Sequence, residues 1–258
     1  MKLIKLLKED STFIPRRSSE ERQKQQINVI QKQIQQYIKN GSNGDLFLKN
    51  TKIENLPDNL KEVNGDLNLK NTNIKTLPDN LKEVNGSLYL NNTNIKTLPN
   101  NLKVKGDLSL YNTKIEKLPD NLKVKGDLYL SYTEIEKLPD NLKVNGSLYL
   151  DNTKIEKLPD NLEVNGSLYL YNTKIEKLPD NLKEVNGDLY LDNTNIKTLP
   201  DNLKVNGNLY LSNTKIEKLP DNLKVKGNLY LSNTKISKKY SVQDIKNNHP
   251  GILGSIYI

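Results

Sequence analysis

The sequence predicts a repeat solenoid, in which short, nearly identical units stack along one axis. Ten copies of one motif follow each other, and they begin at Gly44, Gly65, Gly86, Gly106, Gly126, Gly146, Gly166, Gly187, Gly207 and Gly227. The step is 20 residues, or 21 where a Glu is inserted (Glu62, Glu83 and Glu184). Each of the first nine copies holds six aliphatic residues that it cannot bury alone, and the tenth breaks off after Ile236. Only stacked copies can therefore form a core.

The copy over residues 146–165 shows how one unit should fold. Its Leu148-Tyr149-Leu150 segment alternates, which predicts a strand with both Leu side chains inward and Tyr149 outward. Four further aliphatic residues complete the set: Ile155, Leu158, Leu162 and Val164. Burying one such side chain is worth about 1.5–3 kcal/mol, so an internal copy gains on the order of 10 kcal/mol before chain entropy is subtracted.

Gly, Pro and the Asn-Thr pair should shape the turns. We expect Gly146 to allow a tight turn or a positive φ, and Pro159 to fix an extended segment that cannot be α-helical. Asn152 and Thr153 follow the strand where the chain bends, and their side chains can bond to unpaired backbone groups there. Stacked copies should turn these side chains into a polar ladder.

The pattern Leu148-x-Leu150-x-x-Thr153-x-Ile155-x-x-Leu158-Pro159-x-x-Leu162 resembles the leucine-rich repeat, in its short 20-residue bacterial form with Leu-Pro on the back. The resemblance covers residues 44–236. It implies a right-handed horseshoe with a parallel sheet on the concave face, extended segments on the convex face, and partners bound on the concave side. This chain has Thr where the family usually has its ladder Asn, with Asn one place earlier. Similar arrays occur in proteins of bacteriophages and large viruses, and the Lys/Asn/Ile-rich composition suggests a phage, viral or bacterial-effector origin.

Segments outside the array should cover its ends. Residues 1–43 are expected to form an arm (1–17) and an amphipathic capping helix (19–40) that starts at a capping box on Ser18 and Glu21. Residues 237–258 are expected to form a C-terminal cap. Its short helix should start at Ser241, and a final strand or hydrophobic tail should follow over 252–258.

Composition argues against several classes of protein. There is no Cys, so disulfide and thiol chemistry are excluded. Residues 44–236 carry 27 Lys and 26 acidic residues, a net of +1, so nearly all of the net charge of +8 comes from the ends. Nucleic-acid binding by the array is therefore not favoured. No signal peptide or membrane span is apparent. The expected location is the cytoplasm of the producing or host cell, or a virion.

Catalytic chemistry is not predicted. His249 is the only His and lies next to Pro250 in a turn. With no Cys and no His cluster, we expect no transition-metal site, no cofactor and no enzymatic activity. The broken column of Asp45, Asp66, Asp107, Asp127 and Asp188 is expected to be a solvated face.

The candidate binding surface is the outward side of the predicted sheet. Tyr stands between the two strand Leu residues at Tyr89, Tyr129, Tyr149, Tyr169, Tyr190, Tyr210 and Tyr230. A variable column beside it includes Tyr111, Asp151, Tyr171 and Asp192. Stacked Tyr rings could simply stabilise the sheet, or they could anchor a partner. The favoured function is a protein-binding scaffold. The alternatives are a structural component of a virion or surface assembly held by the N-terminal segment, and a glycan-binding module.

Overall fold

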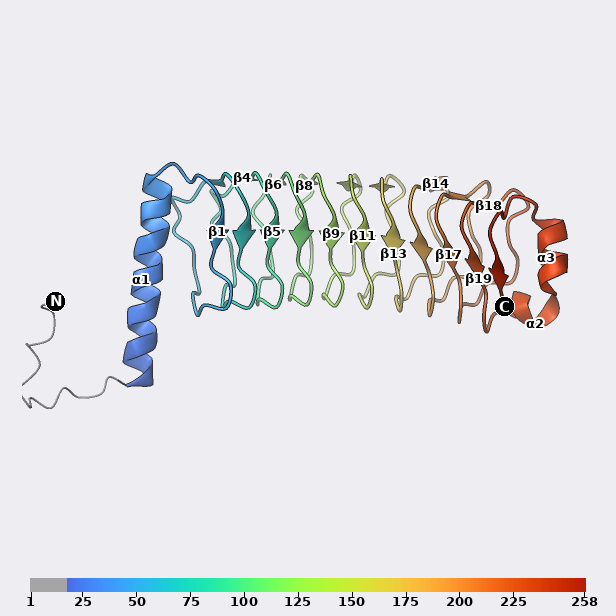
Figure 1. Cartoon of the computed structure of the whole chain (residues 1–258), viewed down its shortest axis with the longest axis horizontal. Helices are drawn as coiled ribbons and strands as arrows, with labels where there is room; N and C mark the ends of the chain where they lie inside the picture. Colours follow the sequence, from blue (N-terminus) through green and yellow to red (C-terminus); the bar gives the residue numbers. More distant parts are fainter. Residues whose placement is uncertain (1–17) are drawn as a thin grey trace, which may run out of the picture.

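The computed structural model describes residues 18–258, so the N-terminal arm predicted over residues 1–17 lies outside the described residues. The described chain is an elongated stack of repeat turns with a helix at each end (Figure 1). Consecutive turns lie side by side along the axis, which is the solenoid that the repeat predicts.

A long parallel sheet runs along one face of the stack, with each strand bonded to the strand of the next copy. Equivalent residues are in register, so that Leu148 pairs with Leu168 and Tyr149 with Tyr169. Its strands are β1 (Leu46–Phe47), β3 (Leu67–Asn68), β5 (Leu88–Tyr89), β7 (Leu108–Ser109), β9 (Leu128–Tyr129), β11 (Leu148–Tyr149), β13 (Leu168–Tyr169), β15 (Leu189–Tyr190), β17 (Leu209–Tyr210), β19 (Leu229–Tyr230) and β20 (Ile256–Tyr257).

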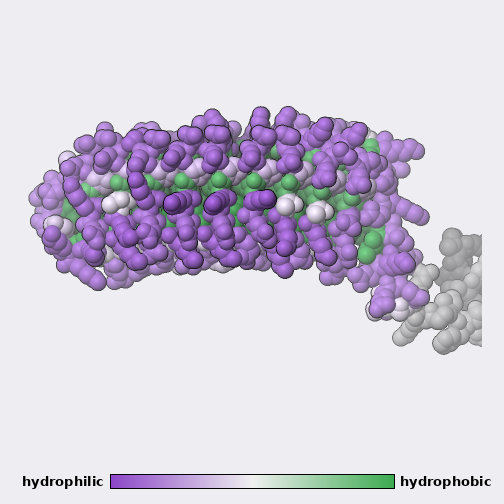
Figure 2. All heavy atoms as spheres, turned by 180° about the vertical axis from the view of Figure 1, so that it is seen from behind, coloured by the Kyte–Doolittle hydropathy of each residue, from purple (hydrophilic) through white to green (hydrophobic). Residues whose placement is uncertain are grey.

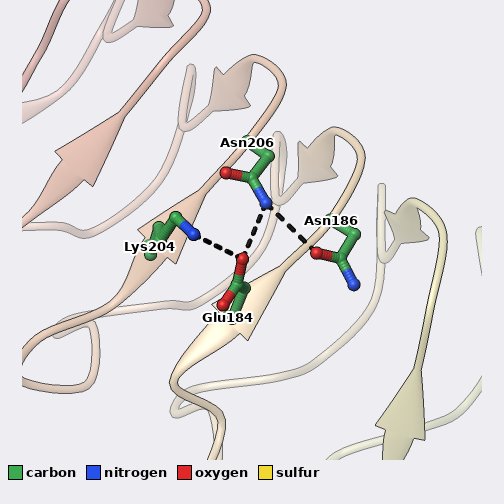
Figure 3. A network of polar contacts seen from close by, with 4 residues as sticks. All are labelled: Glu184, Asn186, Lys204 and Asn206. Carbon is green, nitrogen blue, oxygen red and sulfur yellow. Dashed lines mark hydrogen bonds and ion pairs between the residues drawn. The ribbon is translucent and has the colours of Figure 1, made fainter.

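A second set of strands pairs along another edge of the turns, around the Val of each of the first nine copies. They are β2 (Glu62–Val63), β4 (Glu83–Val84), β6 (Lys103–Val104), β8 (Lys123–Val124), β10 (Lys143–Val144) and β12 (Glu163–Val164), followed separately by β14 (Glu184–Val185), β16 (Lys204–Val205) and β18 (Lys224–Val225). The break before β14 coincides with the insertion of Glu184. The Glu184 carboxylate then accepts hydrogen bonds from Lys204 Nζ (2.6 Å) and Asn206 Nδ2 (2.7 Å), which tie two copies together (Figure 3).

All six aliphatic positions of the repeat are buried, as the pattern predicts. Leu148, Leu150 and Ile155 are fully inaccessible, and Leu158, Leu162 and Val164 are 7–9% exposed. Equivalent residues of the first nine copies, with Leu229, Leu231 and Ile236 of the tenth, join one continuous core. Seen from behind, a hydrophobic band follows the array between hydrophilic margins (Figure 2).

Of the two alternatives expected of the repeat Gly, a tight turn or a positive φ, the positive φ occurs only at Gly44, the Gly of the first copy. Among the described Gly residues only Gly41 and Gly44 have a positive φ. Gly166 instead allows neighbouring copies to approach closely, because a Cβ there would lie 2.8 Å from the carbonyl carbon of Gly146 and 2.8 Å from Ser147 N. Asn152 adopts the left-handed conformation, with φ +56°, which Asn tolerates better than most residues.

The Asn-Thr pair forms the predicted polar contacts. Thr153 Oγ1 donates to the carbonyl oxygen of Leu150 (2.7 Å) within its own copy. Asn172 Nδ2 donates to Asn152 Oδ1 of the preceding copy (2.6 Å). The Thr side chain therefore closes the turn, whereas the Asn side chain links neighbouring copies.

Helix α1 (Ser19–Lys39) lies across the first copy at the N-terminal end (Figure 1). Its capping box is present, with Ser18 Oγ accepting from Glu21 N at 3.1 Å. Ile34 is fully buried against the core, and Ile30 and Ile38 are partly buried there. The apolar stripe thus covers the open edge of the array.

The C-terminal end is covered by α2 (Lys235–Lys239), α3 (Val242–Asn248) and β20. The predicted capping box of Ser241 and Asp244 starts α3. The helix α2 was not anticipated; Thr234, the last Thr of the repeat series, caps it. Ile245 and Ile256 are buried, which closes the core.

Candidate binding surface on the long sheet

Seven Tyr rings form a continuous stack on the outward side of the long sheet, and we call it the Tyr ladder: Tyr129, Tyr149, Tyr169, Tyr190, Tyr210, Tyr230 and Tyr257. Neighbouring ring centroids lie 4.2–4.8 Å apart, and their planes differ by 3–12°. This spacing follows from the distance of about 4.8 Å between strands. The ladder is one ring longer than the repeat predicts, because β20 adds Tyr257 in register with Tyr230.

The column two residues before the ladder holds the strands together and also contacts the rings. Asp127 Oδ1 accepts from Ser147 N of the next copy (2.7 Å), and its Oδ2 accepts from the Tyr129 hydroxyl (3.0 Å). Asp188 bonds in the same way to Asn208 N (2.6 Å) and to the Tyr190 hydroxyl (3.3 Å). This Asp-containing column, expected to be a solvated face, therefore links copies through backbone N–H groups.

Packing of the rings makes the phenolate form unfavourable. Burial raises the pKa of Tyr149 to about 12. Burial, together with the hydrogen bond to Asp127, raises the pKa of Tyr129, and burial also raises the pKa of Tyr190. Ionisation of these rings therefore destabilises the folded state.

We expect a loss of stability at alkaline pH. Since the folded pKa of Tyr149 lies near 12 and the ordinary value is 10.0, the unfolded chain ionises first and the free energy of unfolding falls as pH rises from 10 through 12. The ultraviolet absorbance of tyrosinate and the circular dichroism, followed together, should show ladder ionisation coinciding with unfolding. Complete ionisation of all Tyr residues near pH 10 in a still folded protein would contradict this expectation.

Face-to-face stacking determines which parts of the Tyr rings are accessible to a ligand. Inside the ladder, the two neighbours of each ring cover its two faces, so only ring edges and hydroxyl groups remain available. Sugars bind aromatic residues through a free ring face. The ladder interior is therefore better suited to stabilising the sheet than to stacking against a glycan.

The ladder does not continue through the first copies. Ser109 separates Tyr89 from Tyr129 and is 5% exposed. Tyr89 instead carries Lys70 over its ring, with Nζ 4.6 Å from the centroid. The predicted site residue Tyr89 thus lies on the same sheet but apart from the stack.

The variable column forms the rim of the sheet, where the strands end. Tyr111 and Tyr171 project from it and are 40% and 43% exposed. Asp151 and Asp192 flank Tyr171 and are half-buried. Asp151 Oδ1 accepts from Tyr171 N (3.0 Å), and Asp192 Oδ1 accepts from Ser212 N (2.6 Å). Burial raises the pKa of both carboxyl groups, although these hydrogen bonds oppose the shift.

One residue of this rim was missed in the sequence prediction. Tyr132 occupies the position of the ladder Asn, adopts φ +60° and is 51% exposed. Its ring meets that of Tyr111 edge to face, with centroids 5.4 Å apart. The signal was present in the sequence, because Asn stands at this position in the other nine copies.

Other chemistry is sparse over residues 18–258. No group of three or more His, Cys, Asp or Glu side chains in this range is placed to hold a metal ion, and no helix in it is long and apolar enough to cross a membrane. His249 caps the C-terminus of α3, and burial lowers its pKa. Lys and Glu of neighbouring copies form exposed ion pairs, such as Lys197 with Glu176 (2.9 Å), which interrupt any cationic stripe.

The repeat turns, the in-register sheet and the Leu-rich core together define the leucine-rich-repeat fold, and one solved structure supports this assignment. The Toll chain of the Drosophila Toll–Spatzle complex superposes with a TM-score of 0.62 at 20% identity, over 83% of this chain and 34% of that chain. This chain therefore spans about a third of that protein's length.

Two bacterial structures also resemble this chain, with lower TM-scores. The effector YopM of Yersinia pestis has 21% identity over 71% of this chain and 70% of its own, with a TM-score of 0.38. A leucine-rich-repeat protein of Leptospira interrogans has 20% identity over 81% of this chain and 83% of its own, with a TM-score of 0.35. No protein-family profile and no curated protein matches the sequence.

Proposed function

We propose that this chain is a non-enzymatic scaffold that binds a protein partner on the long sheet and its rim. One observation carries the proposal. Within the described array, the large hydrophobic side chains that are exposed are Phe47, Tyr111, Tyr132 and Tyr171, and all of them project from the long sheet or its rim. Exposed aromatic residues gathered on one face are typical of protein-recognition surfaces.

The alternative functions receive less support. A glycan-binding module would need free ring faces, which the stacked interior of the ladder does not provide. A virion or surface component held by the N-terminal segment would depend on residues 1–17, which are outside the described range, and the described α1 uses its apolar stripe to cover the first copy. A phage, viral or effector origin is compatible with protein binding and remains part of the proposal.

Photo-crosslinking tests whether the partner contacts this face. A benzophenone amino acid is introduced at Phe47 on the long sheet, at Ser212 on its rim, or at the exposed Lys157 outside both. Extracts of the cells that carry the gene are then irradiated. We expect discrete protein adducts from Phe47 and Ser212 and none from Lys157. Adducts of equal yield from all three positions, or none from Phe47 and Ser212, would refute the proposal.

A further inference from the structure

We propose that five residues of the rim, Tyr111, Tyr132, Asp151, Tyr171 and Asp192, form a contact site for an extended, arginine-containing segment of the partner. We call these residues the rim cluster. This inference rests on the proposed function and adds the chemistry of the partner. The five residues belong to five consecutive copies and therefore follow each other along one edge of the sheet.

Tyr132 stands at a position where the stability of the fold favours Asn. Asn at its position in other copies accepts or donates a ladder hydrogen bond, for example from Asn112 to Asn92 (2.7 Å). Tyr132 gives up that type of contact and adopts φ +60°, which is unfavourable for a bulky residue. In exchange it places an exposed ring against Tyr111. The two rings leave outer faces on which a guanidinium group can stack.

The fold uses these two carboxylates as hydrogen-bond acceptors, Asp151 Oδ2 also accepting from Ser131 Oγ (3.3 Å), but it does not need their negative charge. Each carboxylate accepts, through one oxygen, a hydrogen bond from a backbone N–H group of the next copy. An Asn side chain supplies the same acceptor, as Asn208 does in the neighbouring column for Asn228 N (2.8 Å). Because burial penalises the charged carboxylate, Asn would satisfy the backbone without that penalty. The negative charge is thus available for a ligand.

No cation of the described chain neutralises these charges. The ion pairs formed among residues 18–258 include neither Asp151 nor Asp192. The exposed ring of Tyr171 lies between Asp151 and Asp192. The two carboxylates are two strand spacings apart, which is about 10 Å. An aromatic ring flanked by two carboxylates is complementary to arginine, whose planar guanidinium stacks on the ring and pairs with an acid.

The length of the rim cluster sets the size of the segment. Four strand spacings separate Tyr111 from Asp192, which is roughly 19 Å. An extended peptide covers that distance with about six residues. Its alternate side chains point the same way, so three Arg residues can reach the rim from one side of the segment.

The probe is the peptide acetyl-(Arg-Ser)3-amide, titrated into the full chain by calorimetry at low ionic strength. The matched control is the same peptide with citrulline in place of Arg, which keeps the shape and removes the charge. We expect binding of the Arg peptide that weakens with added salt, and no binding of the citrulline peptide. Because the protein has a net charge of +8, non-specific attraction does not favour this peptide.

Three variants locate the site. Asp151→Asn with Asp192→Asn keeps the backbone acceptors and should weaken binding about tenfold or more. Tyr132→Asn restores the residue of the other copies, so it should weaken binding while the melting temperature stays equal or rises. Asp140→Asn with Asp160→Asn removes the same charge from exposed turn positions outside the sheet and should leave binding unchanged.

Several outcomes would overturn the inference. They are no binding of the Arg peptide, equal binding of the citrulline peptide, or equal losses in the rim variant and the Asp140/Asp160 control. Binding of a neutral oligosaccharide at the rim in place of the peptide would overturn it as well. If the peptide fails while the Phe47 and Ser212 adducts persist, a protein still binds this face and only the chemistry assigned to it is wrong.

Discussion

Replacing Gly166 by Ala is expected to lower the free energy of unfolding by about 2–3 kcal/mol, because the added methyl group meets the backbone of the preceding copy. The nearest backbone atoms, the carbonyl carbon of Gly146 and Ser147 N, would lie 2.8 Å from the new Cβ. Since Gly166 does not have a positive φ, Ala could adopt its conformation and would otherwise stabilise the chain by about 0.4–1 kcal/mol. The steric term should win, and urea-induced unfolding followed by circular dichroism measures it.

A double variant identifies which contact matters. Ser147 Oγ would also lie 2.6 Å from the added Cβ, so Ser147→Ala removes the side-chain part of the clash and leaves the backbone part. We expect Ser147→Ala to rescue little of the loss in Gly166→Ala. Full rescue, or a Gly166→Ala protein as stable as the parent, would show that close backbone approach is not the reason for Gly in the repeat.

Replacing Tyr169 by Ala is expected to cost about 2–4 kcal/mol of unfolding free energy. Tyr169 stacks on Tyr149 at 4.2 Å and on Tyr190 at 4.4 Å. Each contact contributes about 0.5–1.5 kcal/mol beyond the buried area of the ring. Tyr257 has a single neighbour in the ladder, so Tyr257→Ala should cost about half as much. Tyr169→Phe keeps the ring and should change stability by less than about 1 kcal/mol.

A substitution of the neighbouring Tyr171 serves as the control that distinguishes an effect on stability from an effect on binding. Tyr171 is 43% exposed and has no stacking partner among the described aromatic pairs. Tyr171→Ala should therefore change stability by no more than about 0.5 kcal/mol and still weaken binding of the Arg peptide. Equal stability losses for Tyr169→Ala and Tyr171→Ala would mean that the ladder adds nothing to the sheet.

Much of the surface prediction depended on which residues the sheet brings together. The period of the sequence placed Tyr149 and Tyr169 in one column and predicted a stacked strip of rings, but it left open whether the stack stabilises the sheet or binds a partner. The in-register parallel pairing sets the ring spacing near the strand spacing, and this is why the rings cover each other. Asp151 and Asp192 were predicted as residues of the candidate binding surface. Their roles as acceptors of backbone N–H groups became visible only with the neighbouring copy in place.

By itself, the sequence determined the solenoid, the buried set of six aliphatic residues in each of the first nine copies and the capped helices α1 and α3, because these depend on local periodicity and short-range hydrogen bonds. Only the tertiary structure decided why Gly recurs, that Tyr257 extends the ladder and that Tyr132 meets Tyr111. Each of these depends on contacts between copies about 20 residues apart, or between the array and its cap. Such contacts are set by the distance and register between neighbouring turns, which a pattern within one copy does not contain.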